Sequence, residues 1–407
     1  MTLSQLLASL ISIAAVFSYI NYRFLRLPST IGLMLLALCL SLLILLLDQF
    51  GLGLRPAAEK LIHSIAFDDA LLHGMLSFLL FAGALHVNLA DLALQKWVIL
   101  ALATVGIMIS TLIIGLAAWW LFAWLGFDIS FLYCLLLGSL ISPTDPIAVL
   151  GILKKAGAPK TLETKITGES LFNDGVGVVI FLVILGLITG DAEFEISTVM
   201  TLFAIEAIGG ALFGFLVGGL AFFMLRSVDQ YQVEILVTLG LVMGGYALAE
   251  VLHVSAPIAI VVAGLMIGNH GRLLAMSDKT REHVDTFWEL IDEILNAVLF
   301  VMIGLEILVV SLGADYLKAG LLMIPIVLAA RFVSVGLPVT VMARFRDFSP
   351  RVVTILTWGG LRGGISVALA LSLPKGDERD LILTVTYCIV IFSIMVQGLT
   401  IGRIISK

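Results

Sequence analysis

Long apolar runs recur along the whole chain and constrain its fold more than any other feature. A helix needs about 20 apolar residues to cross a bilayer, and polar breaks divide the 407 residues into thirteen runs of roughly that size. Hydrophobic residues make up 60% of the chain and charged residues only 13%, about half the charged share of a soluble protein. We therefore predict an all-α polytopic membrane protein with about 13 transmembrane helices. The predicted spans are 5–22, 28–47, 70–87, 97–125, 131–153, 166–188, 196–225, 232–252, 254–268, 289–310, 316–343, 352–373 and 381–401.

The distribution of basic residues predicts the orientation of these spans. With the N-terminus outside, 16 of the 23 lysines and arginines fall in cytoplasmic loops, five fall on the opposite side, and Arg331 and Arg362 lie within spans. Cytoplasmic loops normally carry this excess, so we expect a cell (inner) membrane protein with its C-terminus in the cytoplasm. Met1–Ser4 contains no basic segment, so the first span is expected to be retained. The net charge of −6 offers no basic surface to nucleic acid.

Two spans are interrupted by residues that break helices. The span 131–153 contains Ser-Pro-Thr-Asp-Pro at 142–146, and the span 352–373 contains Gly-Gly-Leu-Arg-Gly-Gly at 359–364. They are the fifth and twelfth spans, and this odd offset of seven places them in opposite orientations in the membrane. Spans four to six and eleven to thirteen are therefore predicted to form an inverted repeat. Two interrupted segments at corresponding positions are typical of the midplane site of a transporter.

Ionisable residues within the predicted spans are the first candidates for function. A charged side chain at the bilayer centre costs about 2.5–3.5 kcal/mol on insertion scales, so it usually faces a cavity or a partner. The ionisable residues within the predicted spans are Asp145, Glu169, Asp174, Glu206, Glu250, Glu306, Arg331 and Arg362. For Glu206 and Glu250 we favour structural or exposed positions.

The proline-rich interruption supplies oxygen ligands. In a helix, its two prolines would leave the carbonyl groups of Ser139 and Ser142 without donors. Free carbonyl groups at this depth are tolerated only where they line a cavity. Together with the Thr144 hydroxyl and the Asp145 carboxylate, they are hard ligands that suit a small hydrated cation. A simple proline kink with a partnered aspartate is the alternative.

The following span carries a polar sector. Glu169 and Asn173 are four residues apart, as are Ser170 and Asp174, so the four side chains share one helix face. Two carboxylates on one face midway along a span predict a functional site, with a polar packing seam as the alternative. Arg331 lies in an otherwise apolar span and needs an anionic partner, for which we choose Glu169.

Two further features concern charged residues outside this polar sector. Arg362 lies in the glycine-rich interruption, where it either pairs with Glu306 or caps freed carbonyl groups, and the sequence does not decide between these. Acidic residues between Arg281 and Glu293 recur at helical spacing, which is typical of a solvated face.

These motifs resemble those of the NhaP-type sodium/proton antiporters, members of the monovalent cation:proton antiporter superfamily that also includes the animal sodium/proton exchangers. The similarity consists of Thr144-Asp145-Pro146, then Glu169-Ser170-x-x-Asn173-Asp174, then Arg331, and finally Gly359-Gly360-Leu361-Arg362-Gly363. It covers essentially the whole chain. The long regulatory tail of the animal exchangers is not expected after Lys407.

The resemblance implies a two-domain transporter in a homodimer. A core domain of residues 97–190 and 316–407 would move against a dimerisation domain of residues 1–96 and 191–315, the latter range including a linker span. The two interrupted helices would cross at the ion site, and access would alternate by an elevator-like motion in membrane lipid. The implied activity is exchange of Na⁺ or Li⁺ for H⁺, with no enzymatic activity and no cofactor beyond the transported ions.

The resemblance also assigns roles to individual residues. Asp174 would be the main carboxylate, for which cation and proton compete, and Asp145 would support it. Thr144 and Ser170 would supply oxygen ligands and Asn173 would orient the site. The candidate cation-site residues are thus Asp174, Asp145, Thr144, Ser170, Asn173 and Glu169, and the candidate charge-pair residues are Glu169, Arg331 and Arg362.

One position bears on stoichiometry. Relatives with two adjacent aspartates in the sixth span are typically electrogenic, whereas this chain has Asn173 before Asp174. Arg331 occupies a position where electrogenic relatives often have a titratable lysine, and an arginine stays protonated. Both features favour electroneutral exchange of one cation for one proton. The alternatives are potassium/proton or mixed-selectivity exchange, a cation channel, and an intramembrane aspartyl protease that uses Asp145 and Asp174.

Overall fold

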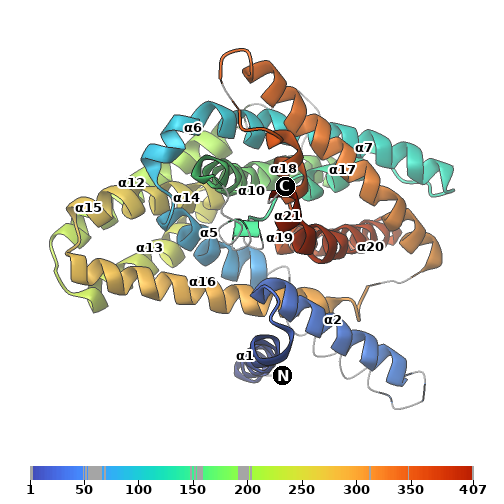
Figure 1. The fold of residues 1–407 in the computed structure, drawn as a ribbon, viewed down its shortest axis with the longest axis horizontal. Coiled ribbons are helices and arrows are strands. Elements are labelled where there is room, and N and C mark those ends of the chain that lie inside the picture. Colours follow the sequence, from blue (N-terminus) through green and yellow to red (C-terminus); the bar gives the residue numbers. More distant parts are fainter. Residues whose placement is uncertain are drawn as a thin grey trace.

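Helices form the regular structure of the residues that this computed structural model describes, namely 3–48, 50, 53, 67, 70–146, 149–150, 153, 159–190, 201, 204–310, 313–346 and 348–405 (Figure 1). Within these residues, eight helices are long and apolar enough to cross a membrane. Strand-like pairing among them is limited to one isolated antiparallel bridge between Asp145 and Leu361. The prediction of an all-α fold is confirmed. The count of thirteen spans is not, because several apolar runs form shorter or interrupted helices.

The α-helices follow one another with few long connections among the described residues. In chain order they are α1 (Leu3–Ile20), α2 (Ser29–Asp48), α5 (Leu76–Leu85), α6 (Leu89–Ala101), α7 (Ile107–Trp124), α8 (Phe131–Ile141), α10 (Lys160–Thr189), α12 (Gly210–Arg226), α13 (Tyr231–Val251), α14 (Ala256–Met266), α15 (Arg272–Leu274), α16 (Asp278–Glu306), α17 (Ala314–Met342), α18 (Val352–Gly359), α19 (Gly364–Leu371), α20 (Asp377–Phe392) and α21 (Gly398–Ile405).

Wider π-helical turns extend or join several of these helices. They are η1 (Asn21–Leu25) after α1, η2 (Ala70–Met75) before α5, η3 (Leu102–Gly106) between α6 and α7, η4 (Ile205–Gly209) before α12, η5 (Ile267–Gly271) between α14 and α15, and η6 (Ser393–Gln397) between α20 and α21. The segment from α6 to α7 is therefore continuous, as is the segment from α20 to α21.

Capping residues account for helix boundaries that the apolar runs alone do not set. Asn88 accepts hydrogen bonds from the amides of Ala90 and Asp91, so α6 begins at Leu89, eight residues before the predicted span 97–125. Ser277 caps α16 in the same way, and this helix begins inside the polar stretch 269–285 that precedes the predicted span 289–310. Much of the predicted span 196–225 before Ile205, and most of 131–153 after Pro146, lie outside the described residues.

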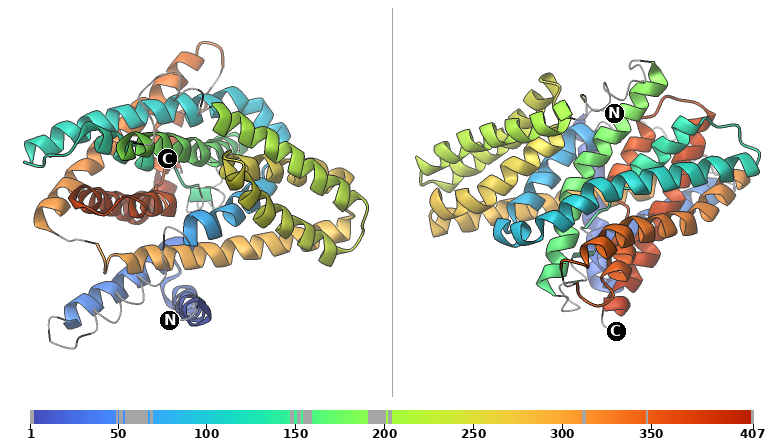
Figure 2. Two further views of the ribbon diagram at one scale, coloured as in Figure 1. Left: turned by 180° about the vertical axis from the view of Figure 1, so that it is seen from behind. Right: turned by 90° about the horizontal axis from the view of Figure 1, so that it is seen from above.

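The helices gather around a central group that contains both interruptions (Figures 1 and 2). On one side α7 packs against α8 and α17, and α17 packs against α20. On the other side α14 packs against α12 and α5, while α16 runs along the edge and contacts α2, α5 and α13. Helix α10 packs against α8 and α6, and α18 and α19 lie beside it at the centre. This arrangement brings the candidate residues of α8, α10, α17 and α18–α19 together.

Candidate cation-binding site

The two interrupted helices meet at their breaks. Helix α8 ends at Ile141 and α18 ends at Gly359, and the unwound segments that follow run antiparallel past each other. The amide of Asp145 donates to the carbonyl oxygen of Leu361 over 2.8 Å. A Cβ atom on Gly363 would overlap the carboxylate of Asp145, so this close approach requires glycine. The predicted crossing of two broken helices is confirmed.

Helix α10 presents its polar sector to the first break. Glu169, Ser170, Asn173 and Asp174 are all buried, with exposed fractions from 0% for Asn173 to 9% for Asp174. The helix can lie this close because a side chain on Gly177 would overlap the ring of a proline in the break. The four-residue spacing puts the four side chains on one helix face, and the structure shows that this face is buried.

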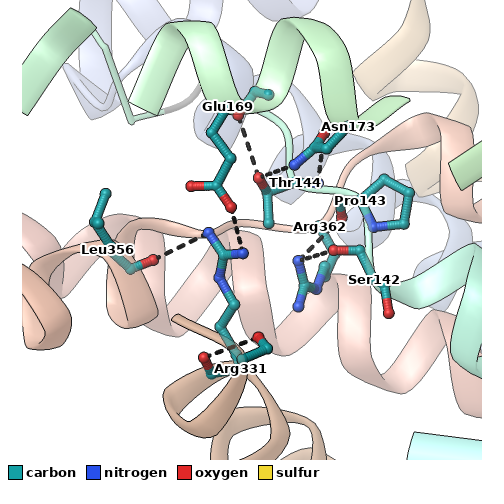
Figure 3. Close-up of polar contacts among 10 residues, drawn as sticks. Ser142, Pro143, Thr144, Glu169, Asn173, Arg331, Leu356 and Arg362 are labelled. Carbon is teal, nitrogen blue, oxygen red and sulfur yellow. Dashed lines mark hydrogen bonds and ion pairs between the residues drawn. The ribbon is translucent and has the colours of Figure 1, made fainter. Parts of the chain in front are cut away.

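Thr144 links the break to α10 through three hydrogen bonds (Figure 3). Its backbone amide donates to Oδ1 of Asn173 over 3.4 Å, and Nδ2 of Asn173 donates to its hydroxyl oxygen over 2.9 Å. The same hydroxyl lies 3.2 Å from Oγ of Ser170. Asn173 thus holds both the main chain and the side chain of Thr144.

Arg331 and Glu169 form a buried ion pair (Figure 3). Nη1 of Arg331 lies 2.5 Å from Oε1 of Glu169, and the two side chains are 4% and 1% exposed. Nη2 of Arg331 also donates to the carbonyl oxygen of Leu356 over 3.4 Å. The pairing predicted from charge is present, and it ties α17 to both α10 and α18.

Arg362 caps the carbonyl groups that the proline break frees. Its Nη1 donates to the carbonyl oxygens of Ser142 and Pro143, each over 3.0 Å, and its backbone amide donates to Oγ of Ser393 over 2.9 Å. Of the two roles that the sequence left open, carbonyl capping is the one present. Glu306 is buried at the end of α16.

A cavity of about 490 Å³ lies beside the crossing. Its wall includes four of the six candidate cation-site residues, namely Thr144, Asp145, Ser170 and Asp174. Glu169 and Asn173 do not line the cavity. Glu169 instead accepts a hydrogen bond from Arg331, and Asn173 donates one to Thr144. The cavity extends along α10 to Lys160 and Glu163 at the start of that helix, where the Lys160 side chain is 75% exposed. Asp145 and Asp174 therefore share a space that continues toward one end of the bundle.

The lining of the cavity also contains polar residues that sequence reasoning missed. His86 and Asp91 lie at the α5–α6 turn, and Glu289 and Asp292 lie on α16. Glu289 and Asp292 belong to the acidic tract that was expected to be a solvated face. Glu289 is exposed, but Asp292 is half-buried against the cavity, so that expectation is wrong for this residue. Their three-residue spacing was the available signal, but it does not say what the face meets.

Two other expectations concern residues away from the cavity. Glu206 is half-buried and Glu250 is exposed, and neither is part of the cavity wall.

Over the described part of the chain, no group of three or more histidine, cysteine, aspartate or glutamate side chains is placed to hold a metal ion.

The whole-chain similarity decides the family. Residues 11–407 match the family described as "Sodium/hydrogen exchanger, transmembrane". The chain belongs to this family. As a sodium/hydrogen exchanger family member with apolar helices of spanning length, it is a multi-pass membrane protein. Similarity to a curated NhaP antiporter over nearly the whole chain confirms the resemblance to NhaP-type antiporters.

Individual relatives of this exchanger family extend the comparison. The chain is 53% identical to the Na⁺/H⁺ antiporter NhaP of Pseudomonas aeruginosa, over 99% of this chain and 96% of that protein. It is 35% identical to the Na⁺/H⁺ antiporter NhaH of Halobacillus dabanensis, over 95% and 93% of the two chains. Its fold matches the sodium proton antiporter MjNhaP1 of Methanocaldococcus jannaschii, solved at pH 8, with a TM-score of 0.78. That match covers 100% of this chain and 99% of the other at 19% identity, and it concerns the fold alone.

Proposed function

We propose that this protein is a secondary active transporter, and not an enzyme, that exchanges Na⁺ or Li⁺ for H⁺ across the cell membrane. The chain matches two curated relatives named Na⁺/H⁺ antiporter over nearly their whole length. The observation that carries the proposal is that Asp145 and Asp174 line one cavity at the point where two unwound helices cross. No resident cofactor is needed, because the ions are the substrates.

Asp174 is the proposed site of competition between cation and proton. Asp174 is only 9% exposed and lines the cavity together with Thr144 and Ser170. A bare carboxylate that crosses the low-dielectric barrier costs several kcal/mol. The site therefore moves readily only when Asp174 carries a cation or a proton. Because both ligands use the same oxygens, binding of one excludes the other, and the exchange is obligatory.

The proposed stoichiometry is one cation for one proton. Asn173 is neutral and both ends of its amide bind Thr144, so it adds no titratable charge beside Asp174. Arg331 is held in the buried ion pair with Glu169, so the proposal assigns it no transported proton. With one carboxylate changing ligand per cycle, the exchange moves no net charge, and a membrane potential should not alter its rate.

The proposed movement is that of a core domain, residues 97–190 and 316–407, against a dimerisation domain, residues 1–96 and 191–315. The large cavity supports this division, because it is lined by α10 and α19 of the first domain and by α5 and α16 of the second. The distribution of basic residues predicts that the start of α10 faces the cytoplasm, and we propose that the cavity opens toward that side. Homodimer formation and elevator-like motion are part of the same proposal.

Transport in proteoliposomes tests the proposal directly. With an acidic lumen that contains a pH dye, external Na⁺ or Li⁺ should raise the lumenal pH at the same rate with and without a clamped membrane potential. Asp174→Asn should reduce this signal to the level of empty liposomes, because an amide cannot exchange a proton for a cation. Asp128→Asn removes an exposed carboxylate outside the site and is the matched control.

Other outcomes would change the proposal in defined ways. Voltage-dependent exchange would contradict electroneutrality but retain antiport. A response to K⁺ alone would replace sodium with potassium as the substrate. Transport by Asp174→Asn close to that of the unmodified protein would overturn the role of Asp174.

A further inference from the structure

A second, much smaller cavity lies behind the ion pair. Its volume is about 10 Å³, and it lies between α17, α18 and the glycine-rich break. This is the lower limit of the space that one water molecule requires. Its polar lining comes from Arg331, Thr357, Arg362 and Gln397.

Two buried polar atoms at this cavity lack hydrogen-bond partners among the described residues, namely Nε of Arg331 and Oγ1 of Thr357. The two residues are 4% and 8% exposed. Buried polar groups are almost always bonded to protein or to an ordered water. Nη1 and Nη2 of Arg331 already contact Glu169 and Leu356, so Nε is the donor that needs an acceptor.

The surrounding contacts fix where that acceptor lies. A Cβ atom on Gly360 would be 2.8 Å from Nε of Arg331, so the absence of a side chain there leaves this edge of the guanidinium uncovered. Thr357 is one turn before the break on α18, next to Leu356, whose carbonyl oxygen accepts from Nη2. Gln397, which donates to the carbonyl oxygen of Trp358, lines the same space.

We propose that one water molecule occupies this cavity and bridges Arg331 and Thr357. The water accepts a hydrogen bond from Nε of Arg331 and forms a second one with the Thr357 hydroxyl. A halide would also suit two neighbouring arginines, but the cavity has the volume of a single water.

The bridge makes Thr357 a positioning residue. Through the water it holds the third nitrogen of the guanidinium whose other two nitrogens hold Glu169 and Leu356. Glu169 lies on α10 one residue before Ser170 and five before Asp174, so the orientation of Arg331 affects the cavity wall. This consequence rests on the proposed transport function, whereas the presence of the water does not.

A map of the full-length protein tests the water itself. In a map sharp enough to show other buried waters, we expect a peak within hydrogen-bond distance of both Nε of Arg331 and Oγ1 of Thr357. An empty cavity at that quality would overturn the assignment. An anomalous signal at this position after bromide exchange would also overturn it, in favour of an anion.

Substitutions test the positioning role. Thr357→Val keeps the side-chain shape and removes the hydroxyl, so we expect the apparent KM for sodium to rise about fivefold, the effect of one lost hydrogen bond. Thr357→Ser keeps the hydroxyl and should restore the KM to within about twofold. Thr386→Val is the matched control, because Thr386 is fully buried on α20, has an unpartnered hydroxyl within the described chain, and lies outside this cavity.

The outcomes distinguish the two proposals. Equal KM values for Thr357→Val and Thr386→Val would overturn the positioning role. If Thr357→Val fails to fold, the map of the unmodified protein still tests the water, and a KM for Thr357→Ser outside the expected twofold range would overturn the positioning role. If the unmodified protein moves no cation, the proposed function fails, while the map still tests the water.

Discussion

The backbone amide of Asp145 donates a 2.8 Å hydrogen bond to the carbonyl oxygen of Leu361. This bond joins two unwound segments that interrupt helices far apart in the sequence. Unwound backbone at membrane depth is stable only when its polar groups are satisfied inside the protein. Here each break helps to satisfy the other, because Arg362 of the second break caps the carbonyl groups of Ser142 and Pro143 in the first. The crossing and the cation site therefore form one structure.

Gly363 is the position where this crossing tolerates least change. We expect Gly363→Ala to destabilise the protein by about 1–3 kcal/mol, the usual cost of overpacking a well-packed interior, and to reduce exchange. The reason is that the added methyl group would overlap the Asp145 side chain. Thermal unfolding in detergent and proteoliposome exchange are the measurements.

Gly359, at the start of the same glycine-rich segment, supplies the control for that experiment. A Cβ atom on Gly359 would find its nearest neighbour 3.7 Å away, which is an ordinary contact. Gly359→Ala should therefore leave both stability and exchange nearly unchanged. Equal effects of the two alanines would show that crowding at Asp145 is not the cause.

The buried pair of Arg331 and Glu169 should show strong energetic coupling. Removal of one partner leaves the other charge buried and alone, which typically costs about 3–5 kcal/mol. We expect Arg331→Ala and Glu169→Ala each to lower the unfolding temperature, and the double variant to lower it by much less than the sum. Unfolding temperatures of the four proteins measure the coupling.

An exposed ion pair provides the comparison for this cycle. Arg281 and Asp278 lie 2.7 Å apart on the first turns of α16, with side chains that are 36% and 94% exposed. Such surface pairs contribute little because water and salt screen them. The same cycle on this pair should show little coupling, and additive effects at Arg331 and Glu169 would contradict the buried ion pair.

Local signals in the sequence were sufficient for part of the site. Prolines and glycines act on their own backbone, so both breaks could be predicted from their residues alone. The four-residue spacing on α10 is likewise local, and it correctly placed Asn173 and Asp174 on one buried face. Arg331 could be paired with Glu169 because a buried cation needs an anion.

Features that depend on tertiary packing could not be predicted. The two roles of Arg362 differ only in where its long side chain ends, and that depends on how close the breaks approach. Asp292 looked like part of a solvated face because helical spacing does not reveal what a face meets. The missing hydrogen-bond partners of Nε of Arg331 and Oγ1 of Thr357 can be recognised only when the positions of all neighbouring groups are known.

Asn269 is expected to hold the turn between α5 and α6. Its Nδ2 donates to the carbonyl oxygen of Val87 over 3.0 Å, and its Oδ1 accepts from the amide of Leu89 over 2.7 Å. Asn269→Ala leaves both backbone groups without these partners, so we expect a loss of about 1–3 kcal/mol. Hydrogen exchange at Leu89 should accelerate, while exchange at Ile258, which is capped by Ser255, serves as an internal control. Unchanged protection at Leu89 would contradict this role.

Asp292 should attract cations into the large cavity without binding them at the crossing. It is half-buried on α16 and lines the wall that faces Asp145 and Asp174. A negative charge in such a cleft raises the local cation concentration. We therefore expect Asp292→Asn to raise the apparent KM for sodium by about two- to threefold with little change in maximal rate, an effect that inert salt should weaken. Glu293→Gln removes the adjacent, exposed carboxylate, which does not line the cavity, and should leave the KM unchanged. An equal shift in both variants would mean that general surface charge, rather than the position of Asp292 in the cavity wall, sets the apparent affinity.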